Sequence, residues 1–134
     1  MRIHRLLFVL CGLGLLSVGP VYAHHSASSE FDTQSAIQVK GILTKMDWIN
    51  PHAYMHLAVK DSTGKVANWD VEMAGLSKLR LAGMGKKQFV VGETYTIVGN
   101  PARGGRHMVL VGTLTFPDGQ VFRRGADFDD GAYK

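Results

Sequence analysis

The sequence predicts an all-β domain with one short helix, preceded by a cleaved signal peptide, and three observations carry this prediction. An apolar run follows two basic residues at the start of the chain and is too short to span a bilayer comfortably. Apolar and polar residues then alternate in several segments, which is typical of half-buried strands. Only the stretch from Gly75 to Gly83 has near-helical apolar spacing.

Residues 1–23 have the parts of a Sec-type signal peptide. Arg2 and Arg5 precede the apolar run, and positions 21 and 23 carry the small residues that signal peptidase prefers. We expect cleavage after Ala23, so that His24 becomes the first residue. The product is then a periplasmic or secreted protein of 111 residues, which is the length of one domain.

The processed chain contains no cysteine, because Cys11 lies within the leader. Leu10 stands where a lipoprotein signal needs a small residue, so we expect no membrane anchor. Thiolate metal sites and thiol redox chemistry are thereby excluded. Loss of Arg2 and Arg5 leaves thirteen basic and eleven acidic side chains, a net charge of +2, so no nucleic-acid partner is expected.

The domain is expected to begin after a polar lead-in. Residues 24–36 form the predicted flexible N-terminal segment, which Phe31, its one large apolar side chain, pins to the domain. A long strand over residues 37–49 follows, bent at Gly41 and ended by an Asn-Pro break.

Two further strands, over residues 53–59 and 66–73, are joined by a tight turn at 61–65. If the first and last residues of this turn pair, paired residue numbers sum to 126. This register puts apolar pairs on one face, and a slip by one residue would bury charges. The polar pairs on the other face are His56 with Asp70 and Tyr54 with Glu72.

The remaining elements give the order of the fold. They are a short helix at 75–83, a strand at 94–98, a glycine loop at 103–106, and strands at 107–116 and 120–123. Three strands, a helix and two strands is the connectivity of the OB-fold, a small five-stranded barrel, which we expect over residues 37–123. A meander sandwich is the alternative, and residues 124–134 are expected to be a disordered tail.

Several motifs run through nearly the whole processed chain. They are His-His-Ser at 24–26, Glu-Phe-Asp at 30–32, Val-Lys-Gly at 39–41, Trp-Ile-Asn-Pro-His at 48–52, the turn at 61–65, Val-Glu-Met at 71–73 and residues 114–119. With these motifs the chain resembles a bacterial exported family of uncharacterised function. The resemblance implies a small secreted single-domain protein and no established activity.

Five histidines remain after cleavage, and two of them begin the chain. His24 would carry a free α-amine beside its imidazole, with His25 next to it, and such a chelate suits a borderline-soft metal, copper above all. Cleavage one residue earlier would give an Ala-His-His start that can wrap Cu(II) in a square plane. The sequence therefore predicts a copper carrier, buffer or sensor. The opposing interpretation is a tail that binds nothing.

A body histidine is expected to complete this site: His52, His56 or His107. His52 and His56 would lie about 13 Å apart on one strand, too far to share a metal. Asp70 is expected to orient the ring of His56, with Glu72 a further supporting carboxylate, although a plain cross-strand pair explains Asp70 equally well. Soft thioethers would suit Cu(I), but the register puts Met55 and Met73 on the apolar face, where we expect them to fill the core, and Met108 points away from its neighbour His107.

A metal-free module that binds a polymer or a periplasmic protein partner is the alternative function. Tyr54 would carry that binding, with Trp48 a further candidate. The chain has no Gly-x-Ser-x-Gly elbow and no phosphate-binding loop, so we do not expect an enzyme. An oxidase built on an N-terminal copper histidine ranks last.

Overall fold

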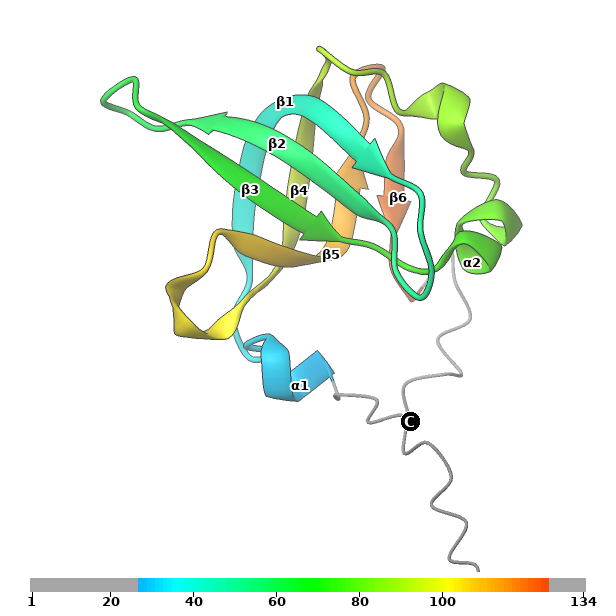
Figure 1. Ribbon diagram of the computed structural model, residues 1–134, viewed down its shortest axis with the longest axis horizontal. Helices are drawn as coiled ribbons and strands as arrows, with labels where there is room; N and C mark the ends of the chain where they lie inside the picture. The colour runs from blue at the N-terminus through cyan, green and yellow to red at the C-terminus, as the bar shows by residue number, and fades with distance from the viewer. Residues whose placement is uncertain (1–26, 126–134) are drawn as a thin grey trace, which may run out of the picture.

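The computed structural model describes residues 27–125, in which five strands close into a barrel (Figure 1). β1 (Ile37–Asp47) pairs antiparallel with β2 (Tyr54–Lys60) and with β4 (Thr94–Pro101). β2 pairs with β3 (Val66–Glu72), and β4 pairs with β5 (Met108–Thr115). A parallel pairing of β3 with β5 closes the ring. The predicted five-stranded, OB-like barrel is therefore confirmed, and a meander sandwich is excluded.

Short helices and one further strand complete the fold. α1 (Ala27–Glu30) precedes β1, while α2 (Leu76–Leu81) and η1 (Lys86–Gln88) connect β3 to β4. η2 (Arg103–Gly105) lies between β4 and β5, and β6 (Val121–Arg123) pairs with β5 beyond the residues that pair with β3. α2 is the helix that the sequence predicts. The other helical turns have three or four residues, too few to show a hydrophobic period.

β1 is long because it serves two neighbours, β4 along its first half and β2 along its second. Gly41 lies where β1 approaches β2 most closely, since a Cβ there would be 2.8 Å from both the Ala58 oxygen and Val59 Cγ2. A bulge between Leu43 and Lys45 then shifts the register with β2. The glycine is needed at this position because two backbones meet without room for a side chain.

The hairpin of β2 and β3 has the predicted register. Tyr54 pairs with Glu72 and His56 with Asp70, so paired residue numbers sum to 126. Met55 lies between the two polar residues of β2 and is fully buried. The alternation thus separates an apolar inner face from a polar outer face, as the sequence predicts.

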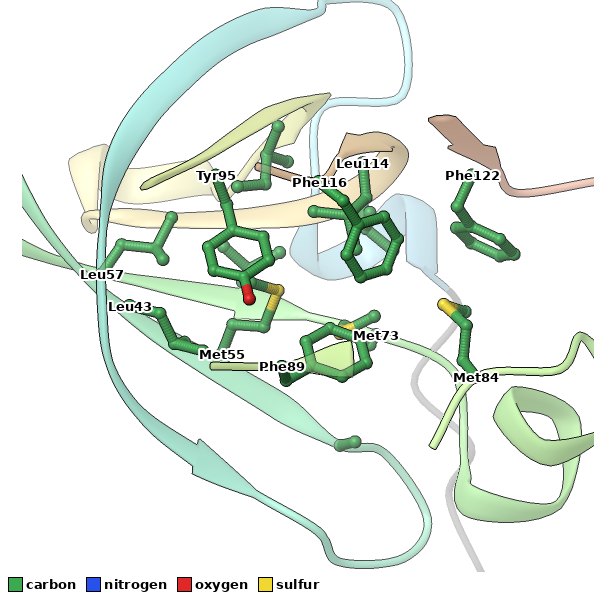
Figure 2. Packing of buried hydrophobic residues seen from close by; sticks show 14 of the residues in the cluster. Leu43, Met55, Leu57, Met73, Met84, Phe89, Tyr95, Leu114, Phe116 and Phe122 are labelled. Carbon is green, nitrogen blue, oxygen red and sulfur yellow. The ribbon is translucent and has the colours of Figure 1, made fainter. Parts of the chain in front are cut away.

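The barrel interior is filled by apolar side chains from all five strands and from the connection after α2 (Figure 2). Tyr95 is fully buried, and its hydroxyl accepts the Val90 N–H (2.8 Å) and donates to the Gln88 carbonyl (3.2 Å). Phe89 and Phe116 pack edge to face beside it, with ring centroids 5.4 Å apart. The same cluster contains Leu43, Met55, Leu57, Met73 and Leu114, so the expected core position of the two hairpin methionines is confirmed.

Several predictions concern residues outside the described part of the chain. They are the leader and its cleavage after Ala23, the N-terminal histidines His24 and His25, and most of the tail. Within residues 27–125, no helix has the length and apolar character needed to cross a bilayer.

Candidate functional site

A polar outer face extends over the end of β1 and over β2 and β3, which lie side by side in Figure 1. Residues on either side of the buried Met55 and Val71 point outward, because side chains alternate along a strand. This polar face consists of Asp47, Tyr54, His56, Asp70 and Glu72. Together with His52, which lies in the loop before β2, this face contains two histidine–carboxylate arrangements of different character.

The first arrangement is His56 between two carboxylates. Its Nδ1 lies 2.7 Å from Asp70 Oδ1, and its Nε2 lies 2.9 Å from Asp47 Oδ2. Lys45 Nζ contacts the other oxygen of Asp47 at 2.7 Å. The predicted pair of His56 with Asp70 therefore exists. The second carboxylate, however, takes the nitrogen that a metal would need, so His56 links β1, β2 and β3 and is poorly placed to bind an ion.

Asp47 is a site residue that sequence reasoning missed. It pairs with Tyr54, but the bulge in β1 shifts this register by one residue, and no sequence pattern reports the shift. Hydrogen bonds from Lys45 and then from His56 lower the pKa of Asp47 below its ordinary value. The carboxylate is thus held in its charged form at the outer edge of the polar face.

The second arrangement is His52 on a buried carboxylate. His52 Nδ1 lies 2.6 Å from Glu72 Oε1, and the Tyr54 hydroxyl donates to Glu72 Oε2 at 3.3 Å. Glu72 is the one charged residue of 27–125 that is buried, with only 6% of its surface exposed. Burial raises the pKa of Glu72 above its ordinary value, and the charge of His52 acts in the opposite direction. Burial, followed by the charge of Glu72, raises the pKa of Tyr54 to about 12.

This arrangement has the form of an oriented metal ligand. A carboxylate that contacts Nδ1 of a histidine orients the ring, which is how many proteins position a metal-binding imidazole. Tyr54 remains protonated at neutral pH and donates a hydrogen bond to the other carboxylate oxygen of Glu72. The carboxylate fixed in this way positions the ring of His52. We refer to these three residues as the His52 cluster.

The loop between β1 and β2 that carries His52 is fixed to the core on both sides. Trp48 is half-buried and packs edge to face against Phe89, with ring centroids 5.3 Å apart. The Leu76 N–H donates to Asn50 Oδ1 at 3.3 Å. Trp48 therefore holds the loop to the barrel, and it does not extend the face that carries Tyr54.

His107 lies apart from the His52 cluster. Its exposed ring stacks on Trp69, with centroids 5.0 Å apart and planes inclined by 13°. The parallel register places His107 five positions along the strands from the level of His52, about 16 Å. Within residues 27–125, no three side chains of His, Cys, Asp or Glu converge as a metal site would require.

Apolar contacts hold the segment before β1 to the outer side of β5. Phe31 is 1% exposed and packs with Ala102 and Leu110, and its backbone forms a bridge with Ala102. The Asp32 N–H donates to the Pro101 carbonyl at 2.9 Å. The sequence predicts that Phe31 attaches this segment to the domain, and the burial of Phe31 against Ala102 and Leu110 confirms the prediction.

Two arginines of the loop between β4 and β5 form hydrogen bonds to the same segment. Arg103 Nε donates to the Ser28 carbonyl (3.2 Å), and Arg106 Nη2 contacts Glu30 Oε1 (3.0 Å). The charge of Glu30 contributes to the raised pKa of both Glu72 and Tyr54. Glu30 of α1 therefore lies within electrostatic reach of Glu72 and Tyr54. We call residues 27–35, together with the loop that holds them, the clasp.

Part of this site could have been found from the sequence. The register that pairs Tyr54 with Glu72 makes His52 a diagonal neighbour of Glu72 on the same face. The arginine contacts of the clasp carry no such signal, because the two arginines are more than 70 positions from the residues that they contact.

The chain belongs to a family of unknown function (DUF6152), whose model matches residues 14–111. No curated protein matches the chain.

Proposed function

We propose that this member of the DUF6152 family is an exported protein that binds copper through the histidines at the start of its processed chain, as a carrier, buffer or sensor. One observation supports the proposal above the others: the clasp holds Ala27 to Glu30 against the loop between β4 and β5, with the charge of Glu30 in electrostatic reach of Glu72. Catalysis is not part of the proposal.

The clasp limits where the start of the chain can go. Ala27 packs against the Phe31 cluster, and only three residue steps separate it from His24. Three steps span about 10 Å at most, so a chain that begins at His24 keeps its amine near the polar face. A long flexible segment would lose conformational entropy when its histidines bound a metal together with the domain. The clasp already orders residues 27–35, so less of this entropy is lost on binding.

The proposed donors suit Cu(II). They are the amine and ring of His24, the ring of His25, and Nε2 of His52, all of them nitrogen. Cu(II) gains more than other divalent first-row ions from such a set. Glu72 and Tyr54 would orient His52 beneath the ion. We do not assign a ligand role to His56, whose two nitrogens contact carboxylates, or to His107, which stacks on Trp69.

Titration of Cu(II) into protein that begins at His24 tests the proposal. We expect one tight site, with nitrogen hyperfine structure in its electron paramagnetic resonance spectrum. His24→Ala should weaken this site strongly, and His107→Ala should leave it unchanged. A variant with one glycine added before His24 blocks the α-amine while it keeps every side chain, and it should also weaken binding.

Unchanged Cu(II) affinity in both the His24→Ala and His25→Ala variants would refute the proposal. The metal-free alternative, a module that binds a polymer or a protein partner through the Tyr54 face, makes the opposite prediction. Tyr54→Ala would then abolish binding to the partner, and a chelator would have no effect on it.

A further inference from the structure

The connection between β3 and β4, residues 75–92, combines positive charge with exposed apolar side chains. It carries four basic residues and no acidic one, and the nearest carboxylates on either side are Glu72 and Glu93. Eight large hydrophobic side chains are exposed within residues 27–125, and three of them belong to this segment: Leu81, Val90 and Val91. Neither the barrel core nor the His52 cluster accounts for this combination. We call residues 75–92 the basic connection.

Buried side chains fix the basic connection to the barrel at regular intervals. Leu79, Met84 and Phe89 are five residues apart, and all three belong to the core cluster. Figure 2 shows Met84 and Phe89 among the other side chains of that cluster. The residues between these contacts, at 80–81 and 86–87, are exposed. One side of the segment therefore packs on the barrel, and its other side faces the solvent.

The solvent side of the basic connection carries unpaired charge and projecting apolar groups. Arg80, Lys86 and Lys87 are exposed, and within residues 27–125 no carboxylate forms an ion pair with them. Leu81 is 88% exposed at the end of α2, more than any other large hydrophobic residue of the described chain. A leucine in this position contributes almost nothing to the core, so its apolar surface is available to a partner.

The loop between β1 and β2 adds one more apolar side chain beside the basic connection. Trp48 packs on Phe89, and Asn50 accepts a hydrogen bond from the Leu76 N–H. Ile49 lies between these two contacts in the chain and is exposed. Half of the eight exposed hydrophobic side chains are thus in the basic connection or next to it.

We propose that the basic connection binds the surface of an anionic phospholipid bilayer. Leu81 and Val91 enter the headgroup region, and the exposed cations contact lipid phosphates. Segments that bind at a bilayer surface combine apolar side chains with lysine and arginine in this way. Protein interfaces are depleted in lysine, so the composition favours lipid over a protein partner. The contact is reversible and independent of copper, and it goes beyond the function proposed above.

Sedimentation with vesicles tests the inference, in a buffer that contains a chelator. The protein begins at His24, because the apolar leader would itself associate with lipid. We expect binding to vesicles of phosphatidylglycerol and phosphatidylcholine, weakened by salt, and no binding to phosphatidylcholine alone. Lys86→Gln with Lys87→Gln should lower the partition onto anionic vesicles by about tenfold or more. The matched control, Lys60→Gln with Lys65→Gln, removes the same charge from exposed positions of the β2–β3 hairpin and should stay within about threefold of the parent.

A fluorescent label identifies the part of the protein that meets the lipid. Protein that begins at His24 has no cysteine, so one introduced cysteine carries the label. A polarity-sensitive dye on Leu81→Cys should brighten on anionic vesicles. The same dye on Val66→Cys should not change, because this exposed residue lies at the hairpin end of β3, across the barrel from α2 in Figure 1. Leu81→Gln keeps a good helix former and removes apolar surface, and it should weaken binding by about tenfold.

Three results would overturn the inference. The first is no binding to anionic vesicles, or equal binding to neutral ones. The second is binding that the variant of Lys86 and Lys87 retains and the control variant of Lys60 and Lys65 loses. The third is a dimer in solution that Leu81→Gln dissociates, without vesicle binding, which would assign the surface to a second copy of the chain. Thermal unfolding verifies that each variant is folded, and all substituted side chains are exposed.

Discussion

His52 and His56 lie on the same outer surface, and each contacts a carboxylate through Nδ1, yet their surroundings differ. His56 lies between two half-exposed carboxylates, so both sides of its ring are used to tie strands together. His52 rests on a buried carboxylate that a tyrosine also holds. A histidine–carboxylate pair thus links strands at His56, whereas at His52 it orients the histidine ring. What distinguishes them is the second partner and the degree of burial.

The largest expected difference between the two histidines is in Cu(II) affinity. Glu72→Gln removes the charge beneath His52, and loss of such a supporting carboxylate typically costs about 10–100-fold in metal affinity. Asp70→Asn makes the matched change beneath His56 and should leave Cu(II) affinity unchanged. Isothermal titration of both variants, each beginning at His24, measures the contrast. Equal losses in the two would show that the two arrangements do not differ in function.

The sequence predicted the β2–β3 hairpin well because one turn and one alternating pattern fix its register. The five-strand order also followed from local patterns. Asp47 and the arginine contacts of the clasp could not be predicted. A bulge in β1 sets the register of Asp47, and the arginines meet a segment that is distant in the sequence. Partners that are far apart in the chain become visible only when the barrel has brought them together. His52 falls between these cases, since the register makes it a neighbour of Glu72 but does not predict that its ring contacts the carboxylate.

A smaller difference is expected in how pH affects the metal-free protein near the two histidines. Burial raises the pKa of Glu72, so the folded state holds that proton more tightly than the unfolded state does. The resulting stability is complete below the ordinary glutamate pKa and is lost as the pH rises through the raised value. Glu72→Gln should therefore flatten the pH dependence in this window, and at pH 7 it should be at least as stable as the parent. Urea unfolding across the acid range measures this, and a large loss of stability at pH 7 would contradict it.

Asp47 should show the opposite sign and the smallest effect, because its carboxylate is partly exposed and solvent screens its charge. Hydrogen bonds from Lys45 and His56 lower its pKa, so its contribution is present above the ordinary aspartate value and is lost as the pH falls through the lowered one. Asp47→Asn should thus be slightly less stable than the parent at pH 7, and the two should converge in strong acid. The same urea series measures this change. A difference that persisted below the lowered pKa would mean that Asp47 acts through packing and that its charge contributes little to linking the strands.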